Sequence, residues 1–222
     1  REDKRYNLRY MAKLGVEDHR LYEKDLNKKG YKYIAGCDEA GRGPLCGPVV
    51  AAAVILPNDY QLDGLTDSKQ LSEKKRNYYF DIIKKDAISY GIASVSAKLI
   101  DEINIYEASR LAMLNALEKL DIKPDYVITD AMPLPSIKNS LSIIKGDAKS
   151  ITIAAASVLA KVTRDRIMDK LDIEHPEYGF KSHKGYPTKK HLENIEKYGI
   201  LDEYRLSYKP VKNYLEAHKW II

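Results

Sequence analysis

The chain has 222 residues, with 37 Lys and Arg against 32 Asp and Glu, and a formal net charge of +5 at pH 7. This length can bury one full hydrophobic core, and the modest basic excess is compatible with a polyanionic partner without identifying one. The longest uninterrupted apolar run, residues 49–56, is less than half of the ~20 residues that a membrane-spanning helix needs, so we expect no membrane partner.

The first part of the chain is predicted to contain two helices and three strands. Residues 49–56 are apolar throughout, which is typical of a strand buried on both faces. Ser72 has the position of a helix N-cap, and the helix that it begins is predicted to end near Asp86. The other elements expected here are a charged helix over 16–29 and strands over 33–37 and 88–95.

The second part of the chain alternates helices with short strands. We predict helices over 103–120 and 151–171, strands over 126–129 and 141–144, and C-terminal helices over 188–198 and 209–219. The helix over 151–171 has one apolar side, and its other side carries Ser157, Lys161 and Arg164 at helical spacing. Early strands followed by alternating helices and strands predict an α/β fold with a mixed central sheet flanked by helices, in one domain.

A glycine-containing loop follows the first predicted strand. Asp38 and Glu39 precede the loop, and Gly41 and Gly43 flank Arg42. Glycines let backbone approach a ligand closely, and a guanidinium offers paired donors to phosphate oxygens. A solvated turn is the common structure for an acidic pair followed by glycines. A dinucleotide-binding loop is disfavoured, because the spacing is G-x-G-x-x-x-G and the carboxylates would repel a pyrophosphate.

Carboxylates recur at the ends of predicted strands. Asp38 closes the first strand, Asp130 closes the fourth, and Asp147 follows the fifth. Adjacent side chains of a strand point to opposite faces, so Asp38 and Glu39 can share one ion only where the backbone leaves the pleat. Carboxylates gathered at one sheet edge would repel one another without a cation, and a set of oxygen ligands favours Mg²⁺ or Mn²⁺ over zinc. A single Asp in a loop is more often simply solvated.

The two cysteines and three of the histidines give no support for a metal site of their own. Cys37 and Cys46 fit neither a disulfide framework nor the spacing of a metal site, so we expect a reduced, cytoplasmic protein. His175, His183 and His191 recur at intervals of eight, but no Cys accompanies them. We therefore expect them at the surface or at helix caps rather than around zinc.

Residues 38–48, with the apolar run that follows them, resemble the signature of ribonuclease HII. Further segments match in that family's order, at 67–69, 129–130, 145–150, 154–161, 164–166, 183–188 and 205–207. The resemblance covers residues 31–211, and it implies a ribonuclease H-like five-stranded mixed sheet whose first three strands are antiparallel. It divides the chain into an N-terminal helical extension, 1–30, and a catalytic domain with a C-terminal helical region, 31–222.

The resemblance also implies the activity. It predicts an endoribonuclease that hydrolyses the RNA strand of RNA–DNA hybrids and nicks duplex DNA 5′ of a single embedded ribonucleotide, leaving 5′-phosphate and 3′-hydroxyl ends. Two-metal-ion hydrolysis with Mg²⁺ or Mn²⁺ is expected, in which Asp38 and Asp130 are shared by the ions and Glu39 and Asp147 complete one ion each. We expect a monomer.

Substrate-binding residues are implied by the same resemblance. The backbone of Gly41, Arg42 and Gly43 would read the 2′-hydroxyl, and Tyr186 would lie against the sugar of the neighbouring deoxynucleotide. Phosphate contacts are expected from Arg42, Lys69, Lys161 and Lys184, with a hydroxyl contact from Ser68. Two alternatives stay open, which are a type HIII-like hybrid nuclease, whose loop has Gly-Lys-Gly, and a non-catalytic nucleic-acid-binding protein.

Overall fold

The computed structural model describes residues 18–218, and its centre is one five-stranded mixed sheet. The strands, in chain order, are β1 (Ile34–Ala40), β2 (Val49–Ile55), β3 (Ser89–Val95), β4 (Tyr126–Asp130) and β5 (Ser140–Ile143). Their order across the sheet is β3-β2-β1-β4-β5. The first three strands are antiparallel, and β4 and β5 are parallel to β1. The predicted mixed sheet and its antiparallel start are confirmed.

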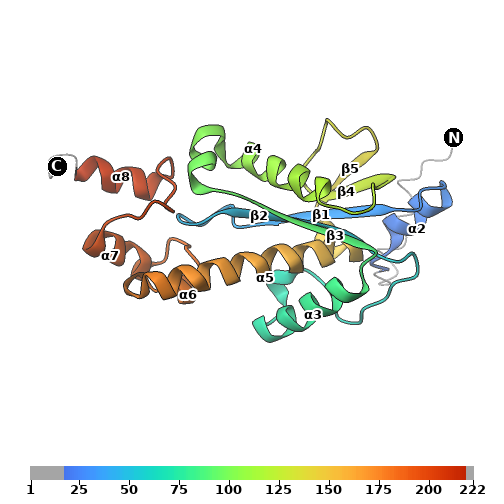
Figure 1. Cartoon of the computed structure of the whole chain (residues 1–222), viewed down its shortest axis with the longest axis horizontal. Coiled ribbons are helices and arrows are strands. Elements are labelled where there is room, and N and C mark those ends of the chain that lie inside the picture. Colours follow the sequence, from blue (N-terminus) through green and yellow to red (C-terminus); the bar gives the residue numbers. More distant parts are fainter. Residues whose placement is uncertain (1–17, 219–222) are drawn as a thin grey trace.

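Helices cover both faces of the sheet. Helix α4 (Ala97–Glu118) lies on one face, and α5 (Ile151–Glu174) and α3 (Glu73–Asp86) lie on the other (Figure 1). Successive side chains of β2 point to opposite faces of the sheet. Ala51 and Ala53 pack in the core under α4, and Ala52 and Val54 pack under α3 and α5. These small side chains let the helices approach the sheet closely.

Glycine permits one further close approach, between β1 and the first turn of α5. A Cβ at Gly36 would collide with the backbone of Thr152 and Ile153. The helix is therefore seated directly on β1, two residues before Asp38. This contact fixes where the start of α5 lies relative to the middle of the sheet.

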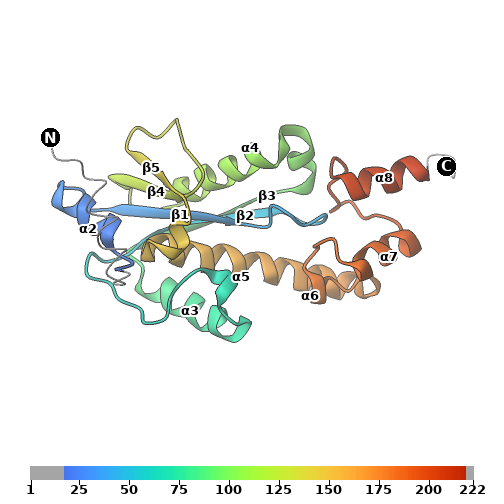
Figure 2. The same cartoon turned by 180° about the vertical axis from the view of Figure 1, so that it is seen from behind.

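A C-terminal group of helices extends the molecule beyond one end of the sheet (Figure 2). It contains α6 (Phe180–His183), α7 (Lys189–Tyr198) and α8 (Lys209–Ala217). These helices share a separate aromatic core around Tyr178, Phe180 and Tyr204. The two predicted C-terminal helices are thus present in residues 18–218, and residue 219 lies outside the described residues.

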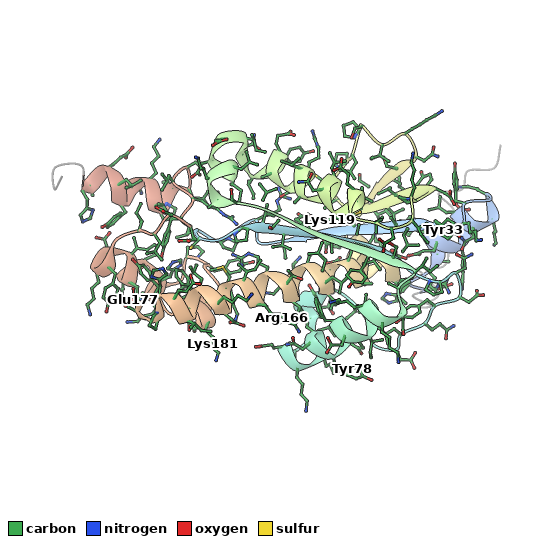
Figure 3. All side chains as sticks on the ribbon, viewed as in Figure 1. Tyr33, Tyr78, Lys119, Arg166, Glu177 and Lys181 are labelled. Atoms are coloured by element: carbon green, nitrogen blue, oxygen red, sulfur yellow. The ribbon has the colours of Figure 1, made fainter. Side chains whose placement is uncertain are left out.

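Helix α3 is tied to α5 by a side chain at the surface. The guanidinium of Arg166 lies 4.3 Å from the ring centroid of Phe80 and donates to Asn77 Oδ1 at 3.0 Å (Figure 3).

Across residues 18–218, no helix combines the length and the apolar character needed to cross a membrane.

Several predicted boundaries differ from the structure. Strand β1 was expected to end at Cys37 but continues to Ala40, because Asp38 and Glu39 keep antiparallel partners in β2. Helix α4 begins at Ala97 and is broken at Asn104, whose side chain caps the segment after the break. The charged helix predicted over 16–29 is present as α2 (Leu21–Lys28), and residues 16 and 17 lie outside the described part. Four short turns of helix were not predicted: Ser68–Gln70, Gly146–Ala148, Pro176–Tyr178 and Phe180–His183.

Candidate active site

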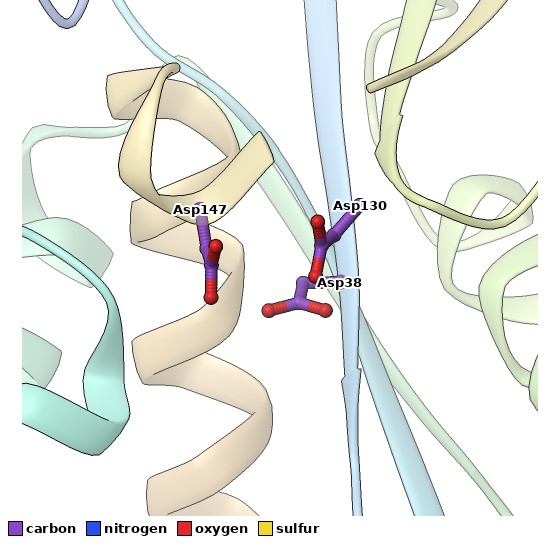
Figure 4. Close-up of side chains that lie close together, drawn as sticks. All are labelled: Asp38, Asp130 and Asp147. Carbon is purple, nitrogen blue, oxygen red and sulfur yellow. The ribbon is translucent and has the colours of Figure 1, made fainter. Parts of the chain in front are cut away.

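Three aspartates from separate elements converge beside the start of α5 (Figure 4). Asp38 comes from β1, Asp130 ends β4, and Asp147 lies in the short helical turn Gly146–Ala148 between β5 and α5. One carboxylate oxygen from each lies within 4.8 Å of the others. Asp38 and Asp147 are buried, and Asp130 is half-buried. The structure therefore brings together three of the four carboxylates expected at one site.

Burial and mutual repulsion raise the pKa values of Asp38 and Asp147, and a bound cation would lower them again. Burial raises the pKa of Asp38 well above its ordinary value, and the neighbouring Glu39 and Asp130 raise it further. Burial, followed by Asp130 and Asp67, raises the pKa of Asp147 to about 6. A divalent ion would relieve both effects, and an all-oxygen donor set suits Mg²⁺ or Mn²⁺. The residues present fit a divalent metal centre.

Glu39 stays outside this group of three. It follows Asp38 within β1, so its side chain shares the face of Ala35 and Cys37, which pack under α4. Pairing with β2 continues through Asp38, Glu39 and Ala40, so the strand ends directly before the glycines. Glu39 instead forms an ion pair with Arg42 at 3.4 Å, and its Oε2 is buried without a hydrogen-bond partner among the described residues. Burial raises the pKa of Glu39, Arg42 lowers it, and Asp130 raises it further.

The aspartates are held in place by backbone N–H groups. Gly146 N donates to Asp130 Oδ1 at 2.7 Å, and Glu39 N donates to Asp38 Oδ1 at 2.7 Å. A hydrogen bond from backbone to the charged carboxylate fixes its orientation before any ion arrives. The turn containing Asp147 is closed by Ser150 N, which donates to Gly146 O at 2.8 Å.

Lys69, in the turn Ser68–Gln70, interacts electrostatically with the carboxylates. Its backbone N–H donates to Asp67 Oδ1 at 2.9 Å, and its ammonium is exposed. Burial acts to lower the pKa of Lys69, but the carboxylates of Asp67, Asp38, Asp147 and Asp130 raise it. Asp67 is a site residue that the sequence prediction missed. Its position in the segment 67–69, which matches the resembled family, was the available signal.

The glycine loop after β1 is held by Arg205, which lies fully buried more than 150 residues away in the chain. Its Nη2 donates to Gly41 O at 2.6 Å and to Gly47 O at 2.9 Å, and its Nη1 donates to Arg42 O at 2.9 Å. Tyr208 adds a hydrogen bond from its hydroxyl to Arg42 O at 2.6 Å. The carbonyl groups of this loop are thus turned inward by a guanidinium.

A second buried guanidinium, that of Arg164, holds the other side of the loop. It donates to Cys46 O at 3.0 Å, to Pro48 O at 3.1 Å and to Lys184 O at 2.9 Å. A Cβ at Gly41, where φ is +96°, would collide with the side chain of Arg164. Arg164, on the predicted polar side of α5, is therefore buried and not exposed to solvent. Its side chain leaves no room for a Cβ at position 41, which explains the glycine there.

Tyr186 lies beside the exposed end of the same loop. A Cβ at Gly43 would lie 3.4 Å from Tyr186 Cε1, so the ring borders Gly43, and 43% of the tyrosine is exposed. Leu45 N donates to Gly185 O at 2.8 Å, which joins the two segments through their backbones. The structure thus brings together Gly43 and Tyr186, which the sequence prediction assigned separately to substrate binding.

Two buried histidines support the turn that carries Tyr186, so the prediction of surface or capping roles is wrong for His183 and His191. Their rings stack with centroids 4.1 Å apart. Gly185 N donates to His183 Nδ1 at 3.2 Å, and His191 Nδ1 lies 2.8 Å from Tyr186 O, to which only a protonated nitrogen can donate. Burial lowers the pKa of His191 to about 4, so this histidine is neutral at pH 7.

The other predicted substrate residues lie along α5 and its neighbours. Lys161 pairs with Asp165 at 2.6 Å, and Lys184 pairs with Asp169. Ser68 is buried, and Ser157 donates its hydroxyl proton to Ser68 Oγ at 2.7 Å. Contacts between these side chains and a substrate stay predictions.

The chain is similar in sequence and in fold to known ribonucleases. The family described as Ribonuclease HII matches residues 35–211. The ribonuclease HII of Bacillus mycoides (strain KBAB4) is 54% identical over 195 residues, which are 88% of this chain and 76% of that protein. The crystal structure of the ribonuclease H2 from Pyrococcus horikoshii OT3 matches with a TM-score of 0.72 at 29% identity, over 85% of this chain and 99% of that one.

A third match separates the family from a related type. The crystal structure of Bst-RNase HIII in complex with Mn²⁺ has a TM-score of 0.66 at 16% identity, over 91% of this chain and 74% of that one. This likeness shows the shared fold alone, whereas the match to ribonuclease HII extends through the sequence. The chain belongs to the ribonuclease HII family and is a metal-dependent ribonuclease H.

Proposed function

We propose that this ribonuclease H nicks duplex DNA 5′ of a single embedded ribonucleotide and also hydrolyses the RNA strand of RNA–DNA hybrids. The observation that carries the proposal is the placement of three converging aspartates near a glycine loop bordered by Tyr186. A hydrolytic centre, a sugar-reading backbone and an aromatic platform are the parts that such a reaction requires. The products are 5′-phosphate and 3′-hydroxyl ends.

The metal centre is assigned to four carboxylates, with Asp38 and Asp130 shared and with Glu39 and Asp147 each completing one site. Glu39 is included because its buried Oε2 lacks a partner among the described residues and because Asp130 acts on its pKa. When bound, two divalent ions supply an activated water and stabilise the leaving oxygen of the phosphodiester. Mg²⁺ and Mn²⁺ both suit these ligands.

Recognition of the 2′-hydroxyl is assigned to the backbone of Gly41, Arg42 and Gly43. Arg205 holds the carbonyls of the first two residues inward, which commits those groups to the protein interior. A preorganised backbone of this kind discriminates strongly, because a substrate lacking the hydroxyl leaves polar groups unpaired. Tyr186 is assigned to the sugar of the adjacent deoxynucleotide, because its half-exposed ring borders Gly43.

Phosphate contacts are assigned to the side chains of Arg42, Lys69, Lys161 and Lys184, with Ser68 adding a hydroxyl contact. Such contacts position a duplex and carry no base specificity. Lys161 and Lys184 each have an intramolecular carboxylate partner, which a phosphate would replace on binding. We assign residues 31–222 to the catalytic domain of a cytoplasmic monomer and residues 1–30 to its N-terminal extension.

The test compares three duplexes that share one sequence: one with a single ribonucleotide, one with a continuous RNA strand, and one entirely of DNA. We expect Mg²⁺- or Mn²⁺-dependent cleavage of the first two and none of the third, with a 5′-phosphate on the downstream product. Cleavage of the continuous RNA strand alone would favour the type HIII-like alternative. Equal cleavage of all-DNA duplex would overturn the assignment of sugar recognition to the glycine loop.

A further inference from the structure

Helix α2 precedes the region that matches the family, yet one of its side chains is buried against α5. Glu23 is 4% exposed. Its Oε1 accepts hydrogen bonds from Ser150 Oγ at 2.5 Å, from Thr152 Oγ1 at 2.8 Å and from Thr152 N at 3.2 Å. The N-terminal segment is therefore joined to the start of the long helix that follows Asp147.

The first turn of α5 depends on this segment for its backbone hydrogen bonds. A helix leaves its first N–H groups without partners inside the helix. Ile151 N donates to His19 O at 2.7 Å, Thr152 N donates to Glu23, and only Ile153 N is capped locally, by Ser150 Oγ at 3.1 Å. A carboxylate at this position is also stabilised by the helix dipole. Two of these three groups thus rely on residues 18–28.

The same turn contacts two of the elements that carry the aspartates. Gly36, two residues before Asp38, lies against the backbone of Thr152. The side chain of Ile153 lies against Gly146, where a Cβ would be 2.7 Å from Ile153 Cδ1. The first turn of α5 therefore sets the distance between β1 and the turn Gly146–Ala148.

That second turn completes the connection to the metal centre. It contains Asp147, and its Gly146 donates the backbone hydrogen bond that orients Asp130. A displacement of the first turn of α5 would consequently move Asp147 and loosen Asp130 relative to Asp38. Small changes in ligand separation matter because divalent ions bind best to a preorganised set of oxygens.

We propose that Glu23 is a positioning residue for the metal centre, acting through the first turn of α5. It touches no metal ligand, and it holds the turn that spaces Asp38, Asp130 and Asp147. This inference rests on the proposed assignment of those aspartates as metal ligands. It gives a defined role to a helix that precedes the matched catalytic region.

The test measures Mn²⁺ binding to the full chain without nucleic acid, by electron paramagnetic resonance or calorimetry, together with kcat and KM on the single-ribonucleotide duplex. Glu23→Ala is expected to weaken Mn²⁺ binding by about tenfold, the size of effect seen when groups that orient metal ligands are removed. Its KM for the duplex should stay within about twofold of wild type. Asp25→Ala is the matched control, because Asp25 lies on the same helix and, among the described residues, its carboxylate pairs with Lys29 at the surface.

Two milder variants keep the test decisive if Glu23→Ala unfolds. Glu23→Gln retains an oxygen that accepts from Ser150 and Thr152, and it is expected to restore most of the Mn²⁺ affinity. Thr152→Val removes one donor without changing the shape of the side chain, and it should weaken Mn²⁺ binding by a smaller factor than Glu23→Ala.

Unchanged Mn²⁺ affinity in both Glu23→Ala and Thr152→Val, with intact circular dichroism, would overturn the inference. An equal loss in Asp25→Ala would overturn it as well, because the effect would then not depend on the contact with α5. If the wild-type protein itself binds no Mn²⁺, or if Asp38→Asn binds it normally, the assignment of the metal ligands fails instead. The two failures are therefore distinguishable.

Discussion

Arg205 Nη2 donates a hydrogen bond of 2.6 Å to Gly41 O, although 164 residues separate the two in the chain. The guanidinium is fully buried, and within residues 18–218 no carboxylate forms a salt bridge with it. Its charge is compensated by backbone carbonyls of the glycine loop instead. This arrangement fixes a loop that would otherwise be free to move, because its glycines restrict the backbone least.

Replacing Arg205 should therefore damage substrate discrimination as well as stability. Arg205→Lys keeps the charge but loses the planar set of donors, so we expect the free energy of unfolding to fall by roughly 2 kcal/mol. The ratio of cleavage at a ribonucleotide to cleavage of all-DNA duplex should fall together with kcat. Urea denaturation and a cleavage assay measure these effects. Arg166→Lys is the control, because Arg166 is exposed on α5, and an equal loss in that variant would contradict the prediction.

The charged aspartates should be required for activity but should destabilise the fold when no metal is bound. Asp38→Asn or Asp130→Asn should abolish cleavage at saturating Mg²⁺ while the fold stays intact. In the absence of metal, Asp38→Asn should unfold at a higher temperature than wild type, because burial and the neighbouring carboxylates disfavour the charged Asp38. Ca²⁺ should support binding of substrate better than cleavage. Near wild-type turnover in either variant would exclude the proposed role.

Replacing Tyr186 and replacing Lys184 should affect cleavage of the two substrates differently. Tyr186→Ala removes a stacking surface worth roughly 1 to 3 kcal/mol, and it should slow cleavage at a single ribonucleotide more than cleavage of a continuous RNA strand. Lys184→Ala should weaken binding of both substrates alike and reduce the slope of the salt dependence by about one unit. Rates on the two duplexes at several salt concentrations separate these outcomes. An equal slowing of both substrates by Tyr186→Ala would contradict a role in sensing the junction.

The contribution of His191 to stability should decrease in mild acid. Burial lowers the pKa of His191 to about 4, whereas an unfolded histidine has a pKa near 6.5. Below about pH 6.5 the unfolded chain binds a proton that the folded chain does not, so the contribution of His191 is full above pH 6.5 and is lost as pH falls toward 4. We expect the contribution of His191 to the free energy of unfolding to fall by about 1 to 2 kcal/mol between pH 7 and pH 5.

The comparison for this prediction is the His191→Gln variant measured across the same pH range. His191 also lies 2.7 Å from the hydroxyl of Tyr204 through its Nε2. Glutamine can donate to Tyr186 O and accept from Tyr204, but it does not titrate. The raised pKa values of Asp38 and Asp147 act in the opposite direction, since a carboxyl that is more easily protonated in the folded state favours folding as pH falls. The difference between wild type and variant isolates His191, and identical pH profiles would contradict its role.

Local patterns along the chain predict the order and type of most elements. The wholly apolar run of β2, the cap at Ser72 and the early succession of strands are local patterns, and each predicted its element correctly. The family resemblance rested on contiguous residues and was likewise readable from the chain. Asp38, Asp130 and Asp147 follow predicted strands, but Asp130 and Asp147 were selected mainly because the family resemblance includes them.

Which polar residues face inward depends on tertiary packing. Arg164 and His191 have polar side chains that a helical pattern assigns to solvent, yet both are buried where distant backbone needs a partner. In the sequence, Glu23 is one of several charged residues of a polar helix. The packing of α5 shows that its carboxylate is buried and accepts hydrogen bonds. These roles depend on hydrogen bonds between segments far apart in the chain. Local periodicity carries no record of such contacts, because it reports the faces of an element and not what packs against them.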